Sequence, residues 1–160
     1  MTKKRIAAII IDSILILLTI SFIFGNSLMD VKQSTNASDS VTEMVEKLPP
    51  VQNAIQNNKI TKNDLDRIIR SFAHIIEFCA LGIETMLLLL LAKLKPLSLS
   101  VFLPFFFCLI LGLADECLQL RTDRAAEVID VLKDFAGSLV GGLAVLAIYS
   151  IISIYKRKKA

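Results

Sequence analysis

Cysteine is scarce in this chain of 160 residues, and histidine is scarcer, with three residues of the first kind and one of the second. Cys79, Cys108 and Cys117 each lie in or beside an apolar run, and no two of them form a C-x-x-C pair. His74 is the single imidazole. Because a zinc site draws about three or four such side chains together, we expect free thiols and no zinc site.

Nucleic-acid binding is not indicated either. The densest basic clusters lie at the two ends of the chain, at residues 3–5 and 156–159, and both adjoin apolar runs. Basic residues in such positions are typical of membrane flanks. The first apolar run, residues 6–24, is longer than the core of a signal peptide and lacks a small-x-small cleavage site, so we expect an uncleaved membrane anchor.

Apolar residues, by contrast, are abundant: they make up 54% of the chain, and the mean hydropathy is +0.64. A soluble domain of similar apolar content is far less hydropathic, so the excess must face lipid. A helix of about 20 mostly apolar residues crosses a bilayer core. We expect one transmembrane domain over residues 1–160, with spans at residues 6–24, 72–92, 97–118 and 131–155.

The positions of lysine and arginine predict the orientation of these spans. With four spans, the basic N-terminus, the tight turn at residues 93–96 and the basic C-terminus all fall on one side. That side is the cytoplasm, because short loops rich in lysine and arginine stay there. The prediction is an all-α, multi-pass cell-membrane protein: an antiparallel four-helix bundle with an extracytoplasmic loop, residues 25–70, between helices 1 and 2, and with both termini cytoplasmic.

Three local signals refine this outline. Thr61 followed by Asp64 is typical of a capping box, so a helix is expected to begin there and run into the second span. Pro104 is expected to kink the third span without ending it. Gly137 and Gly141 form a G-x-x-x-G face that permits close contact with another helix.

Ionisable groups inside spans are costly, so their placement is informative. In the second span, Arg70, His74 and Glu77 recur in steps of four and three and share one helical face. Further acidic and amide groups end the third span and begin the fourth, at Asp115, Glu116, Gln119, Asp130 and Asp134. All lie near the outer ends of their spans, which predicts one polar pocket open to the outside.

These residues resemble a known family of VanZ-like membrane proteins, named for a glycopeptide-resistance accessory that lowers susceptibility to teicoplanin. The resemblance rests on Arg70, Ala73, His74, Glu77, Leu81, Gly82, Asp115, Glu116, Gln119, Arg124, Asp130, Asp134, Gly137 and Gly141, and it extends to Ser27, Ser34 and Ser38. It differs at Ser71, where the family usually has lysine, and at Asp134, where it often has asparagine. The resemblance implies a bacterial envelope protein linked to resistance, without an established reaction.

The functional interpretation assigns each polar group a role. The candidate catalytic residues are His74, Glu77, Asp115 and Glu116, and the candidate binding residues are Arg70, Gln119, Arg124, Asp130 and Asp134. An imidazole beside a carboxylate can serve as a general base, and arginines bind phosphate or carboxylate groups. The carboxylates could take a cation, but no ligand spacing singles one out, so the sequence assigns no metal and leaves the cofactor unknown.

Two other interpretations remain open. The same charges can form a network that only binds a ligand or only locks the helices together. Asp12 and Glu84 lie deeper in their spans. Acids at that depth keep a small proton-coupled transporter as an alternative interpretation. The expected partners are membrane lipid and a lipid-linked cell-wall precursor or a glycopeptide, with no nucleic acid.

Overall fold

The computed structural model describes residues 2–29, 39, 41–93, 100–122 and 127–159. All regular structure in these ranges is helical, in the order α1 (Lys3–Ser27), α3 (Pro49–Gln56), α4 (Lys62–Ala92), α6 (Phe102–Gln119), the short 3-10 helix η1 (Leu120–Thr122) and α7 (Val128–Lys159). Within the described ranges, α1, α4, α6 extended through η1, and α7 are long and apolar enough to cross a membrane. An all-helical protein with four candidate spans is therefore confirmed.

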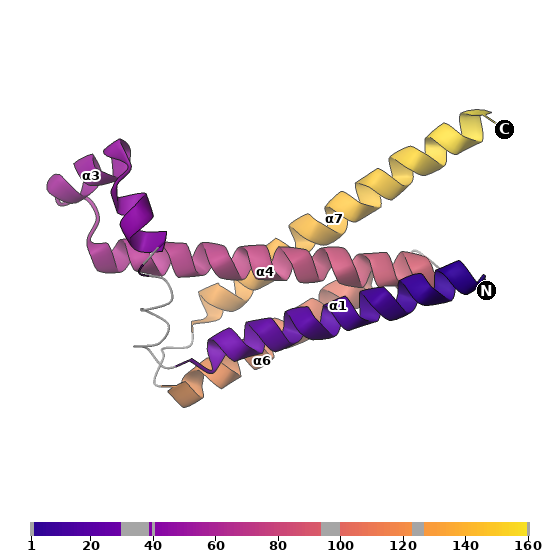
Figure 1. The fold of residues 1–160 in the computed structure, drawn as a ribbon, viewed down its shortest axis with the longest axis horizontal. Coiled ribbons are helices and arrows are strands. Elements are labelled where there is room, and N and C mark those ends of the chain that lie inside the picture. The colour runs from indigo at the N-terminus through magenta and orange to yellow at the C-terminus, as the bar shows by residue number, and fades with distance from the viewer. Residues whose placement is uncertain (1, 30–38, 40, 94–99, 123–126, 160) are drawn as a thin grey trace.

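Helices α1 and α4 lie along each other in opposite directions (Figure 1). Near the chain's N-terminus, the Arg5 side chain donates a 2.6 Å hydrogen bond from Nε to the Leu91 carbonyl at the end of α4. Thr19 donates to Glu84 at 2.9 Å, and at the far end the Asn26 amide donates to a carboxylate of α4. These contacts hold the two helices in register over their length.

Helices α4 and α7 run in the same direction and approach at backbone distance (Figure 1). A Cβ atom added at Gly137 would overlap the Ile75 carbonyl oxygen, and one added at Gly141 would overlap that of Cys79. Only a residue without a side chain permits this approach, as in small-residue contacts between membrane helices generally. The predicted G-x-x-x-G contact is confirmed.

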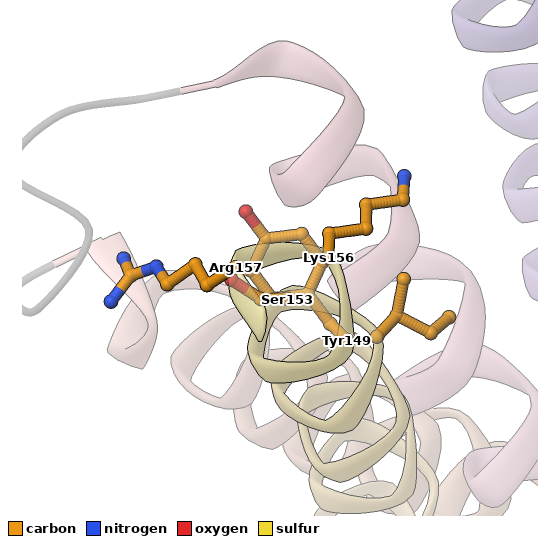
Figure 2. A pocket seen from close by; sticks show the side chains of 5 residues that line it. Tyr149, Ser153, Lys156 and Arg157 are labelled. Atoms are coloured by element: carbon orange, nitrogen blue, oxygen red, sulfur yellow. The ribbon is translucent and has the colours of Figure 1, made fainter. Parts of the chain in front are cut away.

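The glycine contact occurs between the first half of α7 and the middle of α4. The last buried residue of α7 is Gly142, and beyond it the helix diverges from α4 toward its C-terminus (Figure 1). Near its C-terminus, α7 carries an open surface hollow of about 340 Å³ lined by Tyr149, Ile152, Ser153, Lys156 and Arg157, four of which Figure 2 labels. An aromatic ring beside lysine and arginine is typical of a membrane–water interface.

The start of α6 bears on the expected kink at Pro104. The helix begins at Phe102, so Pro104 lies in its first turn. An amide N–H in that turn has no acceptor within the helix, and proline loses nothing there. Ser100, just before this helix, is also helical, and residues 94–99, which include the expected start of the span at residue 97, lie outside the described part. The kink at Pro104 therefore stays a prediction.

The start of α4 agrees with the sequence prediction. The Thr61 hydroxyl accepts a hydrogen bond from the Asp64 amide, while the Asp64 carboxylate accepts one from the Thr61 amide at 2.9 Å. This reciprocal pair satisfies two donors that a helix N-terminus otherwise leaves open. Helix α4 then continues without interruption for 31 residues, so its first turns project beyond the predicted span.

A narrow apolar core joins the long helices. One cluster combines Ile16 and Ile23 of α1 with Phe78 and Leu81 of α4 and Cys108 of α6. Most other large apolar side chains of the spans are exposed, including Leu17 at 64% and Leu18 at 60%. An apolar surface of this extent is normal for helices that meet lipid.

Candidate functional site

Polar side chains of all four long helices meet at the end away from the two termini. Ser27 closes α1, and it lies about 33 Å along that helix from Arg5, because each residue adds about 1.5 Å. That length matches the thickness of a bilayer core. The polar groups that begin α7 and end α6 come to the same level as Ser27 and the first half of α4.

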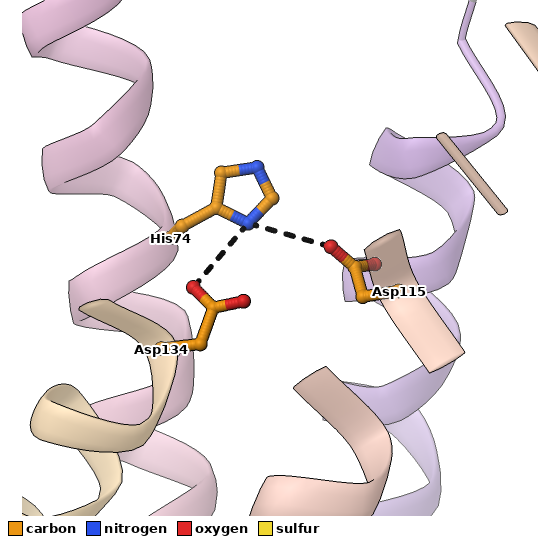
Figure 3. Close-up of side chains that lie close together, drawn as sticks. All are labelled: His74, Asp115 and Asp134. Atoms are coloured by element: carbon orange, nitrogen blue, oxygen red, sulfur yellow. Dashed lines mark ion pairs between the residues drawn. The ribbon is translucent and has the colours of Figure 1, made fainter. Parts of the chain in front are cut away.

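The centre of this group is formed by His74 of α4, Asp115 of α6 and Asp134 of α7 (Figure 3). The His74 Nδ1 atom lies 3.7 Å from Asp115 Oδ2 and 3.9 Å from Asp134 Oδ1. The two aspartate side chains are 0% and 1% exposed. Three helices that are distant in sequence therefore place one imidazole and two buried carboxyl groups around a common point. We call these three residues the central triad.

Asp115 is held by side chains on two sides. Ser27 donates a 2.5 Å hydrogen bond to its Oδ1 atom, and Gln119, one turn later in α6, donates a 2.9 Å bond to Oδ2. Two such bonds stabilise a buried carboxylate and fix its rotamer. The carboxyl group is thus oriented before any ligand binds.

Asp134 has a different environment. Among the residues that the structure describes, neither of its carboxyl oxygens has a hydrogen-bond partner, although both are buried. Four other carboxyl groups, those of Asp115, Glu116, Asp130 and Glu77, are near enough to repel a negative charge on it. A buried polar group without hydrogen bonds is unfavourable by about 1–3 kcal/mol and calls for an explanation.

Two more acids lie beside the central triad. Glu77 accepts a 3.0 Å hydrogen bond from the Asn26 side chain at the end of α1. Glu116 accepts a 3.0 Å bond from the Glu127 backbone amide, just before α7 begins. Glu77 therefore ties the end of α1 to the interior of α4, and Glu116 ties the end of α6 to the start of α7.

Arg70, a basic candidate, lies nearer the start of α4 than the central triad does. Arg70 pairs with Asp66 at 2.8 Å, one turn earlier in α4. It also lines a surface cavity of about 520 Å³ between the first turns of α4 and the helical residues 41–46, together with Asp39, Thr42, Glu43, Glu46, Lys62, Asn63 and Asp66. Four carboxylates and two cations line this cavity, so it is acidic. Arg124 lies outside the described residues.

Asp130 belongs to a separate contact at the start of α7. It forms a 2.5 Å ion pair with Lys133, whose ammonium group also donates to Ser71 of α4 at 3.0 Å. This bridge ties α7 to α4 one turn outside the triad. The sequence interpretation did not single out Lys133, and it treated Asn26 and Ser27 as ordinary loop residues, although the latter belonged to the resemblance.

The deeper acids form their own small group. Thr19 of α1 donates to one oxygen of Glu84. The other oxygen of Glu84 and Oδ2 of Asp12 are buried and have no hydrogen-bond partner in the described part of the chain. Glu84 precedes Ala92, the end of α4, by about 12 Å along the helix. It is therefore distant from the central triad and nearer the chain termini.

One family model matches the chain, that of VanZ/LLP1, over residues 13–152. The chain belongs to the VanZ/LLP1 family. The matched residues include all of α4 and α6, the larger parts of α1 and α7, and the whole central triad. Comparisons with curated proteins and with solved structures gave no match. The VanZ/LLP1 match and the four apolar helices together make this a membrane protein of that family.

The central triad offers this VanZ/LLP1 protein two kinds of chemistry. An imidazole between carboxyl groups can take up a proton and act as a general base. The same nitrogen and oxygen atoms, all within 4.8 Å of one another, can instead hold a cation. Either use requires that the helices keep the three side chains together.

Proposed function

We propose that this protein acts in the bacterial cell envelope, where the polar group around His74, Asp115 and Asp134 binds the head group of a lipid or lipid-linked cell-wall precursor and thereby lowers susceptibility to teicoplanin-type glycopeptides. The carrying observation is the convergence of an imidazole and two buried carboxyl groups from three helices. Family membership supports the link to the envelope. A group of charges only needed for packing would be expected to pair with its opposite sign.

The proposal includes an orientation. The four long helices form an antiparallel membrane bundle with both termini in the cytoplasm, and residues 25–70 form an extracytoplasmic loop. Basic clusters at both ends of the chain support this orientation, as does the Arg5 bond to Leu91 at the same end. The central triad then faces the outer leaflet, where lipid-linked precursors and glycopeptides meet.

Labelling with a membrane-impermeant maleimide tests the orientation. The three native cysteines are replaced by serine, and a single cysteine is introduced at Asn57, after α3, or at Lys158, at the end of α7. Both positions are exposed. We expect Asn57→Cys to react on intact cells and Lys158→Cys to react only after permeabilisation. The reverse pattern would place the triad at the cytoplasmic side and contradict the proposed site of action.

The functional test uses the teicoplanin susceptibility of a sensitive bacterial host. Expression of the wild-type chain is expected to raise the minimum inhibitory concentration, and His74→Gln or Glu116→Gln is expected to return it to that of cells without the protein. Membrane abundance is measured in parallel, because loss of the protein itself would favour a purely structural network. The paired variant Asp12→Asn with Glu84→Gln is the control.

The control also addresses transport, which the deeper acids Asp12 and Glu84 would have to support. We expect resistance to be unchanged in the paired variant, since these side chains lie far from the triad. Loss of resistance at normal abundance in this variant, with the triad intact, would refute the outer binding site in favour of a coupled transporter.

A further inference from the structure

The geometry points to a metal site: His74, Asp115 and Asp134 bind one divalent transition-metal ion through one imidazole nitrogen and two carboxylate oxygens. Imidazole suits zinc and other transition metals, and carboxylate oxygens suit manganese as well. A mixed set of one nitrogen and two oxygens therefore favours Zn²⁺ or Mn²⁺ over Mg²⁺ and Ca²⁺, which prefer oxygen donors alone.

The spacing of the donor atoms fits such an ion. His74 Nδ1 lies 3.7 and 3.9 Å from the two nearest aspartate oxygens, and the three donor atoms lie within 4.8 Å of one another. A point equidistant from three atoms at these separations lies roughly 2.0–2.5 Å from each, which spans ordinary zinc–nitrogen and zinc–oxygen distances. The donors need little movement to close on an ion.

One of the donor groups, the Asp115 carboxylate, is also held by hydrogen bonds from neighbouring side chains, as metal ligands usually are. Ser27 and Gln119 donate to the two oxygens of Asp115, which fixes the direction of that carboxylate. Groups that hold a ligand in this way commonly change metal affinity by about 10–100-fold. They come from α1 and α6, so all four long helices contribute to the site.

A separate observation points to a missing partner. Both oxygens of Asp134 are buried and have no hydrogen bond within the described ranges, and the side chain is directed toward His74 (Figure 3). The carboxyl groups of Asp115, Glu116, Asp130 and Glu77 all disfavour a negative charge on it. A bound divalent cation would compensate both aspartates at once and accept the free lone pairs of Asp134.

The ion would also explain how an acidic site binds an anion. A phosphate group is repelled by carboxylates but is attracted to a metal that has only three protein ligands and keeps a coordination position open. The ligand class at that position, a phosphate of a lipid head group, rests on the function proposed above. The metal site itself does not depend on it.

Metal titration of the purified protein tests the inference. The full chain is prepared in detergent micelles with a histidine-free tag, stripped with chelator, and titrated with Mn²⁺ while the free ion is followed by electron paramagnetic resonance. Mn²⁺ is the first probe because thiols of the three cysteines bind it weakly. We expect a single ion per chain and displacement by Zn²⁺, because affinity rises from manganese to zinc.

The matched variants are Asp134→Asn in the triad and Glu84→Gln, another poorly hydrogen-bonded acid of the membrane part. Asp134→Asn is expected to lower Mn²⁺ affinity by at least about 100-fold, and Glu84→Gln by less than about 3-fold. Circular dichroism verifies that each variant is helical. If Asp134→Asn does not fold, His74→Gln replaces it, with the same expected loss.

Two results would overturn the metal site: no Mn²⁺ or Zn²⁺ binding by the folded wild-type chain, or unchanged affinity in the triad variants. The susceptibility assay separates this inference from the proposed function. Metal binding that depends on the triad, in a chain that confers no resistance, supports the site and refutes the function. Resistance in a chain that binds no metal supports the proposed function and refutes the metal site.

Discussion

Replacing Gly141 with alanine is expected to destabilise the protein by about 1–3 kcal/mol, the usual cost of forcing extra volume into a packed contact. The new methyl group would overlap the Cys79 carbonyl oxygen. That oxygen belongs to the backbone of α4 and moves only if the helices separate. Unfolding by added sodium dodecyl sulphate, followed by circular dichroism in mixed micelles, measures the change in free energy.

Gly25→Ala is the matched control for this prediction. It makes the same substitution inside α1, where an added Cβ atom would meet nothing within 4 Å. Alanine is the better helix former by about 1 kcal/mol, so this variant is expected to be neutral or more stable. Equal responses at Gly25 and Gly141 would show that intrinsic helix preference, and not contact with α4, governs the Gly141 position.

His74→Leu is expected to cost about 3–5 kcal/mol, the range observed when one partner of a buried charge group is removed. The imidazole faces both Asp115 and Asp134, whose side chains are almost completely buried. Without it, two carboxyl groups confront each other in a medium of low polarity. The same unfolding assay, with chelator present in every sample, measures this loss apart from any metal effect.

A second variant distinguishes lost charge balance from lost packing. Combining His74→Leu with Asp115→Asn and Asp134→Asn removes the charges that the imidazole compensates. We expect this triple variant to recover part of the stability that His74→Leu alone has lost, because the three substitutions are coupled. If the triple variant loses as much stability as the three single variants lose in total, the substitutions are independent, and an electrostatic network is contradicted.

The spans were predictable because each signal for them is local. Twenty consecutive apolar residues must cross lipid as a helix, whatever their neighbours, and the Thr61–Asp64 cap is complete within four positions. The start of α6 was harder to place, because apolar residues on both sides of Pro104 gave no sign of where the helix begins. Proline is compatible with a first turn and with an interior kink, so the sequence pattern does not distinguish them.

The level of the polar residues was also predictable. Residue counts from the ends of the spans placed His74, Asp115 and Asp134 near one end, and these three come together in the structure. Their partners were not predictable from spacing. Ser27 and Asn26 end a helix that carries no other strong polar signal nearby, and the hydrogen bond to Asp115 joins residues 88 positions apart.

The sequence by itself determined that the chain is helical, that it lies in a membrane, and that most charged groups of its spans lie near one end of those spans, because hydrocarbon penalises unpaired backbone and charge at every position alike. Tertiary structure alone decided which charges meet. The close approach of α4 and α7 at Gly137 and Gly141 sets how those two helices lie against each other, and that arrangement brings Asp134 toward His74. Such a contact depends on the shape of two helix surfaces at once, which no local pattern in either helix contains.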